Sequence, residues 1–111
     1  GLTVAGQPGT RGYLTPEHLN SYSGGPMQMS DVFQVGILMY TALSGVSPFP
    51  WTGDDYDYMS RLQRGVMRPL GEHRSDLSAQ HVEIVHRSLH PQPARRFRNA
   101  AALRDALEAT P

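Results

Sequence analysis

The stretch that decides the fold is "SDVFQVGILMYTALSG", from Ser30 to Gly45. Ser30 and Asp31 are residue types that cap the start of a helix, and Gly45 readily adopts the left-handed backbone that ends one. The pattern therefore predicts a helix from about Asp31 to Ser44. Apolar side chains go all the way round its axis, which is typical of a helix buried inside a domain. They are Val32, Phe33, Val35, Ile37, Leu38, Met39, Tyr40, Ala42 and Leu43.

A helix that is apolar on every side needs other helices around it, which is an unusual demand for so short a chain. A short helix is expected to begin at Pro16, with Thr15 as its cap. Three longer helices are expected to begin near Asp54, after Ser78 and after Asn99. Their apolar positions are Tyr58, Met59, Leu62 and Val66, then Val82, Val85 and Leu89, then Leu103, Ala106 and Leu107. No segment alternates as a strand does, so the sequence predicts an all-α domain.

The composition excludes several classes of function. The chain has 111 residues and no formal net charge, which fits one domain and argues against a nucleic acid or an anionic membrane as partner. No cysteine is present, and all ten basic residues are arginine, so a phosphate-binding lysine is ruled out. The longest apolar stretch, residues 32–43, is far shorter than the roughly 20 residues that cross a bilayer. Without a visible signal peptide, we expect a cytoplasmic protein with no membrane segment. The first residue is Gly1 and not Met, so we expect a chain that is processed or cut from something larger.

Three motifs, in order and at fitting spacings, carry a resemblance to a known family. They are "GTRGYLTPE" at residues 9–17, "SDVFQVGILMYTALSGVSPF" at 30–49 and "HPQPARRFRNAAALRDAL" at 90–107. Together they resemble the lower half of a protein kinase C-terminal lobe (C-lobe), especially that of bacterial Ser/Thr kinases. Thr15 stands where the family usually has Ala, and Gln92 where Asp is common. The resemblance covers nearly the whole chain and implies a partial kinase domain, with its helices around one buried central helix.

The resemblance assigns the segment near the N-terminus to substrate binding. Gly9, Thr10 and Tyr13 would belong to the loop that receives the substrate residue after the phosphorylated Ser or Thr (the P+1 loop). The alternative is a surface turn that uses Gly9 for its backbone freedom. Thr3 is a candidate activation phosphosite by the same resemblance, although exposed threonines are common.

The resemblance also implies a structural ion pair between Glu17 and Arg96. In the family this buried pair ties the activation segment to the lobe, and Arg96 fits by its spacing from Pro93, with Arg95 as the neighbour that could be mistaken for it. The alternative is two solvated charges. Asp31 would cap the central helix and face the catalytic loop of an intact kinase, or it would be a plain helix cap.

The residues that perform phosphoryl transfer do not occur in the chain. It has no Gly-rich loop, strand lysine, catalytic loop or Asp-Phe-Gly motif, so by itself it is expected to bind neither ATP nor Mg²⁺ and to be inactive. The parent protein would transfer the ATP γ-phosphate to Ser or Thr of a protein. Expected partners are a protein substrate or regulator, the remainder of the kinase domain, and a second copy of the chain. The rival interpretations are a non-catalytic interaction module that works through the helix at residues 54–65, and an unrelated all-α scaffold.

The five histidines do not form a metal-binding pattern. His81 and His86 lie about 140° apart around a helix, and His90 lies at a helix end beside Pro91. The segment also lacks the His-Glu-x-x-His order of a zinc helix. We therefore expect solvated histidines and no metal site. The acidic residues Asp54, Asp55 and Asp57 are more typical of a helix start than of metal ligands.

Overall fold

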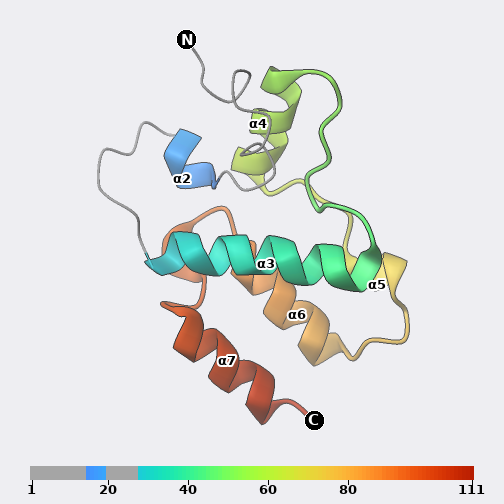
Figure 1. Cartoon of the computed structure of the whole chain (residues 1–111), viewed down its shortest axis with the longest axis vertical. Coiled ribbons are helices and arrows are strands. Elements are labelled where there is room, and N and C mark those ends of the chain that lie inside the picture. The colour runs from blue at the N-terminus through green and yellow to red at the C-terminus, as the bar shows by residue number, and fades with distance from the viewer. Residues whose placement is uncertain (1–14, 20–27) are drawn as a thin grey trace.

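The structure, a computed structural model, describes residues 15–19 and 28–111. In this part of the chain every regular element is a helix, and no strand is present (Figure 1). The predicted all-α fold is therefore confirmed.

The central helix, α3, runs from Gln28 to Ser44 and ends at Gly45, whose φ is 82°. It begins about one turn earlier than the sequence indicated. Asp31 is consequently a residue of the first turn and not the N-cap, so that prediction is wrong. Ser30 does not cap the helix either, because it lies inside α3 and donates its hydroxyl hydrogen to Glu17.

The other long helices begin at the residues that the capping signals indicated. Asp54 accepts hydrogen bonds from two backbone amides of α4 (Asp55–Arg64), and Gly65 ends that helix at a φ of 67°. Ser78 caps α6 (Ala79–Ser88), and Asn99 caps α7 (Ala100–Ala109). The short elements are α2 (Pro16–Leu19), α5 (Leu70–His73) and the 3₁₀ turn η2 (Pro93–Arg95). The sequence did not predict α5 or η2.

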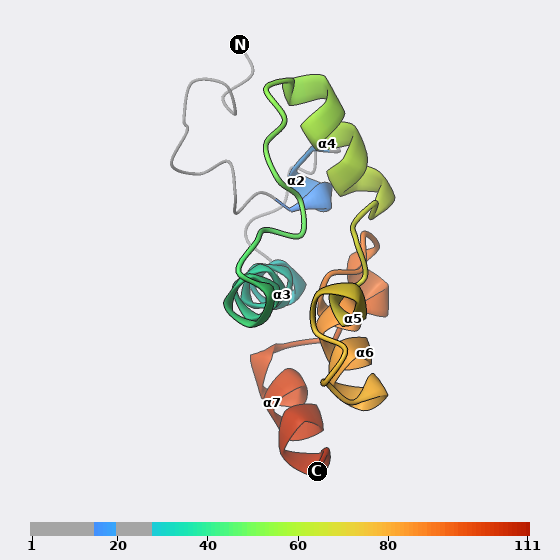
Figure 2. The same cartoon turned by 90° about the vertical axis from the view of Figure 1, so that its right-hand side faces the viewer.

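Helix α3 crosses the middle of the molecule, and other elements pack along it (Figures 1 and 2). Helices α5, α6 and α7 and the turn η2 contact α3, whereas α2 lies against α4. One cluster of buried side chains joins α3 to α4, α5 and α6 through Phe33, Tyr40, Tyr58, Leu62 and Leu70, among others. A smaller one joins α3 to α6 and α7; it contains Val32, Ile84, Phe97 and Leu103.

Gly36 allows α3 and α6 to approach closely. A Cβ atom at Gly36 would lie 3.0 Å from Leu89 Cγ and from Ser88 Cβ at the end of α6. Leu89 and Ser88 are themselves buried. The missing side chain at position 36 therefore sets the separation of α3 and α6.

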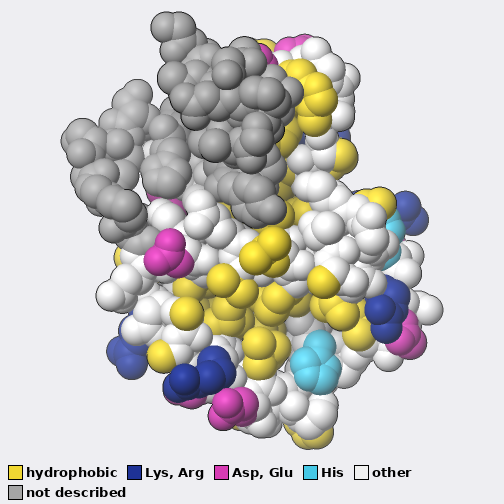
Figure 3. All heavy atoms as spheres, in the orientation of Figure 1, with side chains coloured by type: hydrophobic (Ala, Val, Ile, Leu, Met, Phe, Trp, Pro, Cys, Tyr) yellow, Lys and Arg dark blue, Asp and Glu magenta, His cyan; other side chains and the backbone are white. Residues whose placement is uncertain are grey.

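Helix α3 is central but not enclosed on every side. Its buried residues include Val32, Phe33, Ile37 and Tyr40, whereas Leu38 is 53% exposed. Figure 3 shows a broad band of hydrophobic side chains over α3 and in the region between α3 and α7. Around Leu38, the outer face of α3 therefore has no covering element among the described residues.

No helix in residues 15–19 or 28–111 has the length and apolar character needed to cross a bilayer.

Candidate functional site

A buried ion pair joins α2 to the segment that follows η2. The Arg96 guanidinium donates through Nη2 to Glu17 Oε1 at 2.7 Å and through Nη1 to Glu17 Oε2 at 2.8 Å. Arg96 is 3% exposed and Glu17 6% exposed. Two parallel hydrogen bonds of this kind fix the relative orientation of the two side chains as well as their separation. The structure thus brings together two residues that are 79 positions apart in the chain.

Arg96 also binds two backbone carbonyl groups from other segments. Its Nη1 donates to the carbonyl oxygen of Met29 at 2.8 Å, and its Nε donates to that of His90 at 2.7 Å. The guanidinium lies 4.6 Å from the centre of the Phe33 ring, a cation–π distance. One arginine therefore connects α2, the first turns of α3 and the end of α6.

The charge of Glu17 is stabilised inside this site. Burial by itself raises the pKa of the Glu17 carboxyl, but hydrogen bonds from Arg96 and Ser30 outweigh it and lower the pKa to about 2. Ser30 donates to Glu17 Oε2. The carboxylate is therefore ionised throughout the physiological range, and its negative charge balances the buried guanidinium.

Arg95 does not take part in the pair. It is exposed, whereas Arg96 points inward.

Two features of the site had no clear sequence signal. The Ser30 hydroxyl resembled a helix cap in the sequence, and the stacking of Arg96 on Phe33 depends on a contact between distant segments.

The remaining predicted site residues have different outcomes. Gly9, Thr10, Tyr13 and Thr3 lie outside the described residues. Asp31 is exposed on the first turn of α3.

The four histidines whose side chains the structure describes are not the solvated groups that the sequence indicated, because all four are partly buried. His86 Nε2 accepts a hydrogen bond from the backbone N–H of Leu70 at 3.0 Å, and burial lowers the pKa of His86. Pro69, which precedes α5, provides no side-chain cap, so His86 takes that role from a different helix. His90 Nδ1 accepts from the backbone N–H of Gln92, and its pKa is also lowered, chiefly by burial. These imidazoles are structural acceptors because they are neutral.

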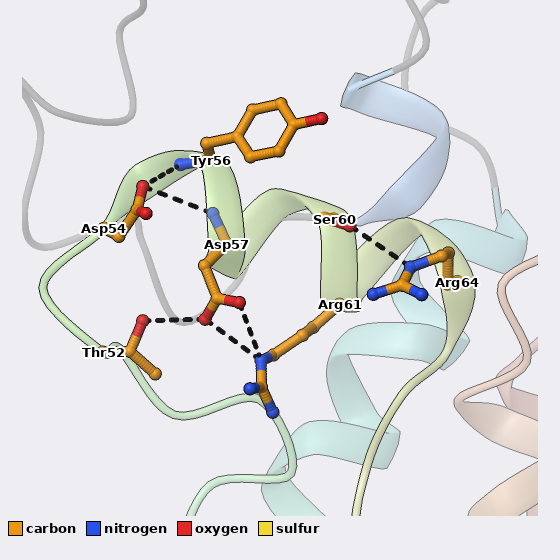
Figure 4. A network of polar contacts seen from close by, with 7 residues as sticks. All are labelled: Thr52, Asp54, Tyr56, Asp57, Ser60, Arg61 and Arg64. Atoms are coloured by element: carbon orange, nitrogen blue, oxygen red, sulfur yellow. Dashed lines mark hydrogen bonds and ion pairs between the residues drawn. The ribbon is translucent and has the colours of Figure 1, made fainter.

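The acidic residues near the start of α4 form a local polar network (Figure 4). Asp54 accepts from the backbone N–H groups of Tyr56 and Asp57. The Asp57 carboxylate accepts from Thr52 and from Arg61 Nε, and these two hydrogen bonds lower the pKa of Asp57. The network shapes the start of α4. Over the described residues, no group of three His, Cys, Asp or Glu side chains is placed to hold a metal ion.

Comparison with known proteins gives the class of protein. MasK, a tyrosine-protein kinase of Myxococcus xanthus, is 30% identical over 96 residues, which are 86% of this chain and 14% of that kinase. The serine/threonine-protein kinase PknA of Mycobacterium tuberculosis is 29% identical over 101 residues, which are 91% of this chain and 22% of PknA. No protein-family model matches the chain.

A solved structure agrees with these relatives at the level of the fold. The twitchin kinase region of C. elegans superposes with a TM-score of 0.72 at 24% identity, over 92% of this chain and 17% of that one. In sequence and in fold, the chain therefore matches protein kinases as a fragment of the kinase C-lobe. It spans 14% of MasK and 22% of PknA, so it matches a minor part of each relative's length.

Proposed function

We propose that the chain is the C-lobe scaffold of a Ser/Thr protein kinase, which transfers the ATP γ-phosphate to a Ser or Thr hydroxyl of a protein. The observation that carries this proposal is the bidentate, buried pair of Glu17 and Arg96. It fixes the end of the "GTRGYLTPE" segment on the helical core. A substrate-binding loop needs such a fixed base because phosphoryl transfer depends mainly on positioning and electrostatics.

In this proposal Gly9, Thr10 and Tyr13 form the P+1 loop that receives the protein substrate. They precede the anchored Glu17 by a few residues, so the anchor limits where the loop can lie. Thr3 is the proposed activation phosphosite. The exposed Asp31 would accept hydrogen bonds from the catalytic loop of the intact kinase.

ATP and Mg²⁺ would bind to the intact protein and not to this chain. The sequence contains no lysine to hold the nucleotide phosphates and no Asp-Phe-Gly motif to hold the metal. The remainder of the kinase domain is therefore an obligatory partner for activity. Because the reaction consumes ATP, we place it in the cytoplasm.

The test uses the natural longer protein that contains this chain. Incubated with γ-³²P-ATP, Mg²⁺ and myelin basic protein, it should label Ser or Thr of that substrate. Thr10→Ala should lower kcat/KM for the protein substrate without changing the melting temperature. Thr52→Ala, at an exposed position near α4, is the control. A folded longer protein that binds ATP but labels no protein would overturn the proposal.

A second candidate is a non-catalytic interaction module derived from a kinase. Tyr56 is 79% exposed and Trp51 42% exposed, beside or on α4. Aromatic residues of this kind are common at the centres of protein interfaces. A longer protein that lacks ATP binding, yet loses a partner on Tyr56→Ala, would favour this candidate.

A further inference from the structure

A groove lies between the loop that follows α3 and the loop that joins α4 to α5. Its volume is about 500 Å³. Apolar side chains and two arginines line it; the six that matter here are Val46, Pro48, Val66, Met67, Arg61 and Arg68. This groove is separate from the Glu17–Arg96 pair, because none of the residues of that pair lines it.

The apolar part of the groove is unusually open to solvent. Val46 is 46% exposed and Val66 41% exposed. They are two of the five large hydrophobic residues that are exposed in the described chain, and they come from different loops. A single exposed apolar side chain is ordinary on a protein surface, but a shared, hollowed apolar surface marks a binding site.

The charged part of the groove is cationic. Arg61, Arg68 and His73 line it, and no carboxylate does so among the described residues. Arg61 contacts Asp57 through Nε at 3.0 Å, and Arg68 contacts Glu72 through Nε at 3.1 Å.

Both arginines retain N–H donors that can bind another carboxylate. In residues 15–19 and 28–111, each of these guanidinium groups donates to side chains through Nε alone. Figure 4 shows the terminal nitrogens of Arg61 extending away from α4. A guanidinium has five N–H donors, so each arginine can bind a second carboxylate without losing its existing partner.

The walls of the groove are held in place before any ligand arrives. The Tyr40 hydroxyl donates to the carbonyl oxygen of Arg68, and the ring of His73 packs edge-on against Tyr40. On the other side, Ser44 Oγ accepts from the backbone N–H of Val46 at 3.2 Å. Little conformational entropy is lost when a ligand enters such a preformed site.

We propose that this groove binds an extended segment of a partner protein in which apolar side chains alternate with acidic ones. An apolar side chain packs on Val46, Pro48 and Val66, and the flanking carboxylates bind Arg61 and Arg68. This docking site goes beyond the proposed phosphoryl transfer and does not depend on it. A failed kinase assay therefore leaves it standing.

The test measures fluorescence anisotropy of labelled hexapeptides against the full chain. The probe is Glu-Leu-Glu-Leu-Glu-Leu; one matched peptide has Gln for every Glu, and another has Ser for every Leu. The probe should bind, and each matched peptide should bind at least about fivefold more weakly, as expected from the loss of about 1 kcal/mol of charge or apolar contact. High salt should weaken binding of the probe.

Variants of the chain separate this groove from the rest of the surface. Arg61→Gln and Arg68→Gln should each weaken binding of the probe about two- to fivefold, as exposed charge pairs do. Val46→Ser and Val66→Ser should weaken it as well. Arg104→Gln is the matched control because Arg104 is an exposed, paired arginine on α7, and it should have no effect. Circular dichroism checks that each variant is folded.

Several results would overturn the proposal. One is the absence of probe binding at about 1 mM, because a millimolar Kd is near the limit of a specific contact. Another is equal binding of the three peptides. A third is unchanged binding of the probe after the double change Arg61→Gln and Arg68→Gln. Loss of the probe as the chain concentration rises would assign the groove to a second copy of the chain and would also overturn it.

Discussion

At the scale of single residues, Arg96 connects separate segments of the described chain. It reaches a carboxylate, two backbone carbonyls and an aromatic ring from segments that are far apart in the sequence. Taking two opposite charges out of water is costly, so the pair is favourable only when its hydrogen bonds are nearly complete. The contacts of Arg96 and the second donor to Glu17, Ser30, meet that requirement.

The low pKa of Glu17 predicts a specific loss of stability in acid. The unfolded carboxyl takes up a proton as the pH falls through its ordinary value of 4.5, whereas the folded one stays ionised down to about 2. Stability from this group is thus complete above pH 4.5 and falls as the pH drops towards 2. Between pH 6 and pH 3, the free energy of unfolding measured by urea melts should fall by about 2 kcal/mol more for the wild type than for Glu17→Gln. Equal slopes would contradict this ionisation behaviour.

Residue roles could be predicted from the sequence where a motif fixes them. Glu17 follows Pro16, and Arg96 follows Pro93, at spacings that a family resemblance supplies. The role of His86 could not be predicted in this way, because it caps a helix 16 residues away and leaves no local pattern. Ser30 was also expected to be a helix cap, but its hydroxyl group donates to Glu17 instead.

At the scale of helices, capping residues predicted where α4, α6 and α7 begin. Asp54, Ser78 and Asn99 each accept a backbone N–H in the first turn, so the signal is local and independent of packing. Helix α5 and the turn η2 have four and three residues, too few to show a helical period. Their positions depend on contacts with α3 and α6, which the sequence does not display.

The close approach of α3 and α6 predicts opposite effects at two glycines. Gly36→Ala should destabilise the protein by about 1–2 kcal/mol, because overpacking against Leu89 and Ser88 outweighs the gain in helix propensity. Gly71→Ala is the matched control, since nothing lies within 4 Å of its added Cβ in α5. It should be neutral or stabilising by up to about 1 kcal/mol. Urea melts of both variants measure this, and equal stability of the two would show that Gly36 does not set the helix separation.

At the scale of the whole molecule, the sequence predicted a central apolar helix but not which face stays open. Apolar residues all round α3 indicate a helix that is buried inside a domain. They do not show which partners are in this chain. The buried face of α3 contacts α5, α6 and α7. Leu38 is exposed on the opposite face, which no described element of the chain covers.

This open face predicts self-association of the chain. Exposed apolar surface of this kind drives dimerisation or aggregation, and the upstream part of a kinase domain should relieve it. Light scattering should give a mass above that of the 12.3 kDa monomer, and Leu38→Glu should lower it. Gln80→Glu, which adds the same charge at an exposed position on α6, is the control. A monodisperse wild-type monomer would contradict the prediction.

The buried pair of Glu17 and Arg96 holds the substrate-side segment on the helical core, and a double-mutant cycle by urea melts tests it most directly. Glu17→Ala and Arg96→Ala should each cost about 3–5 kcal/mol, because each leaves one buried charge without its partner. The double variant should cost clearly less than the sum, and Arg95→Ala should stay within about 0.5 kcal/mol of the wild type. Additive losses below about 1 kcal/mol each would mean that the two charges are solvated, and would contradict the anchored arrangement.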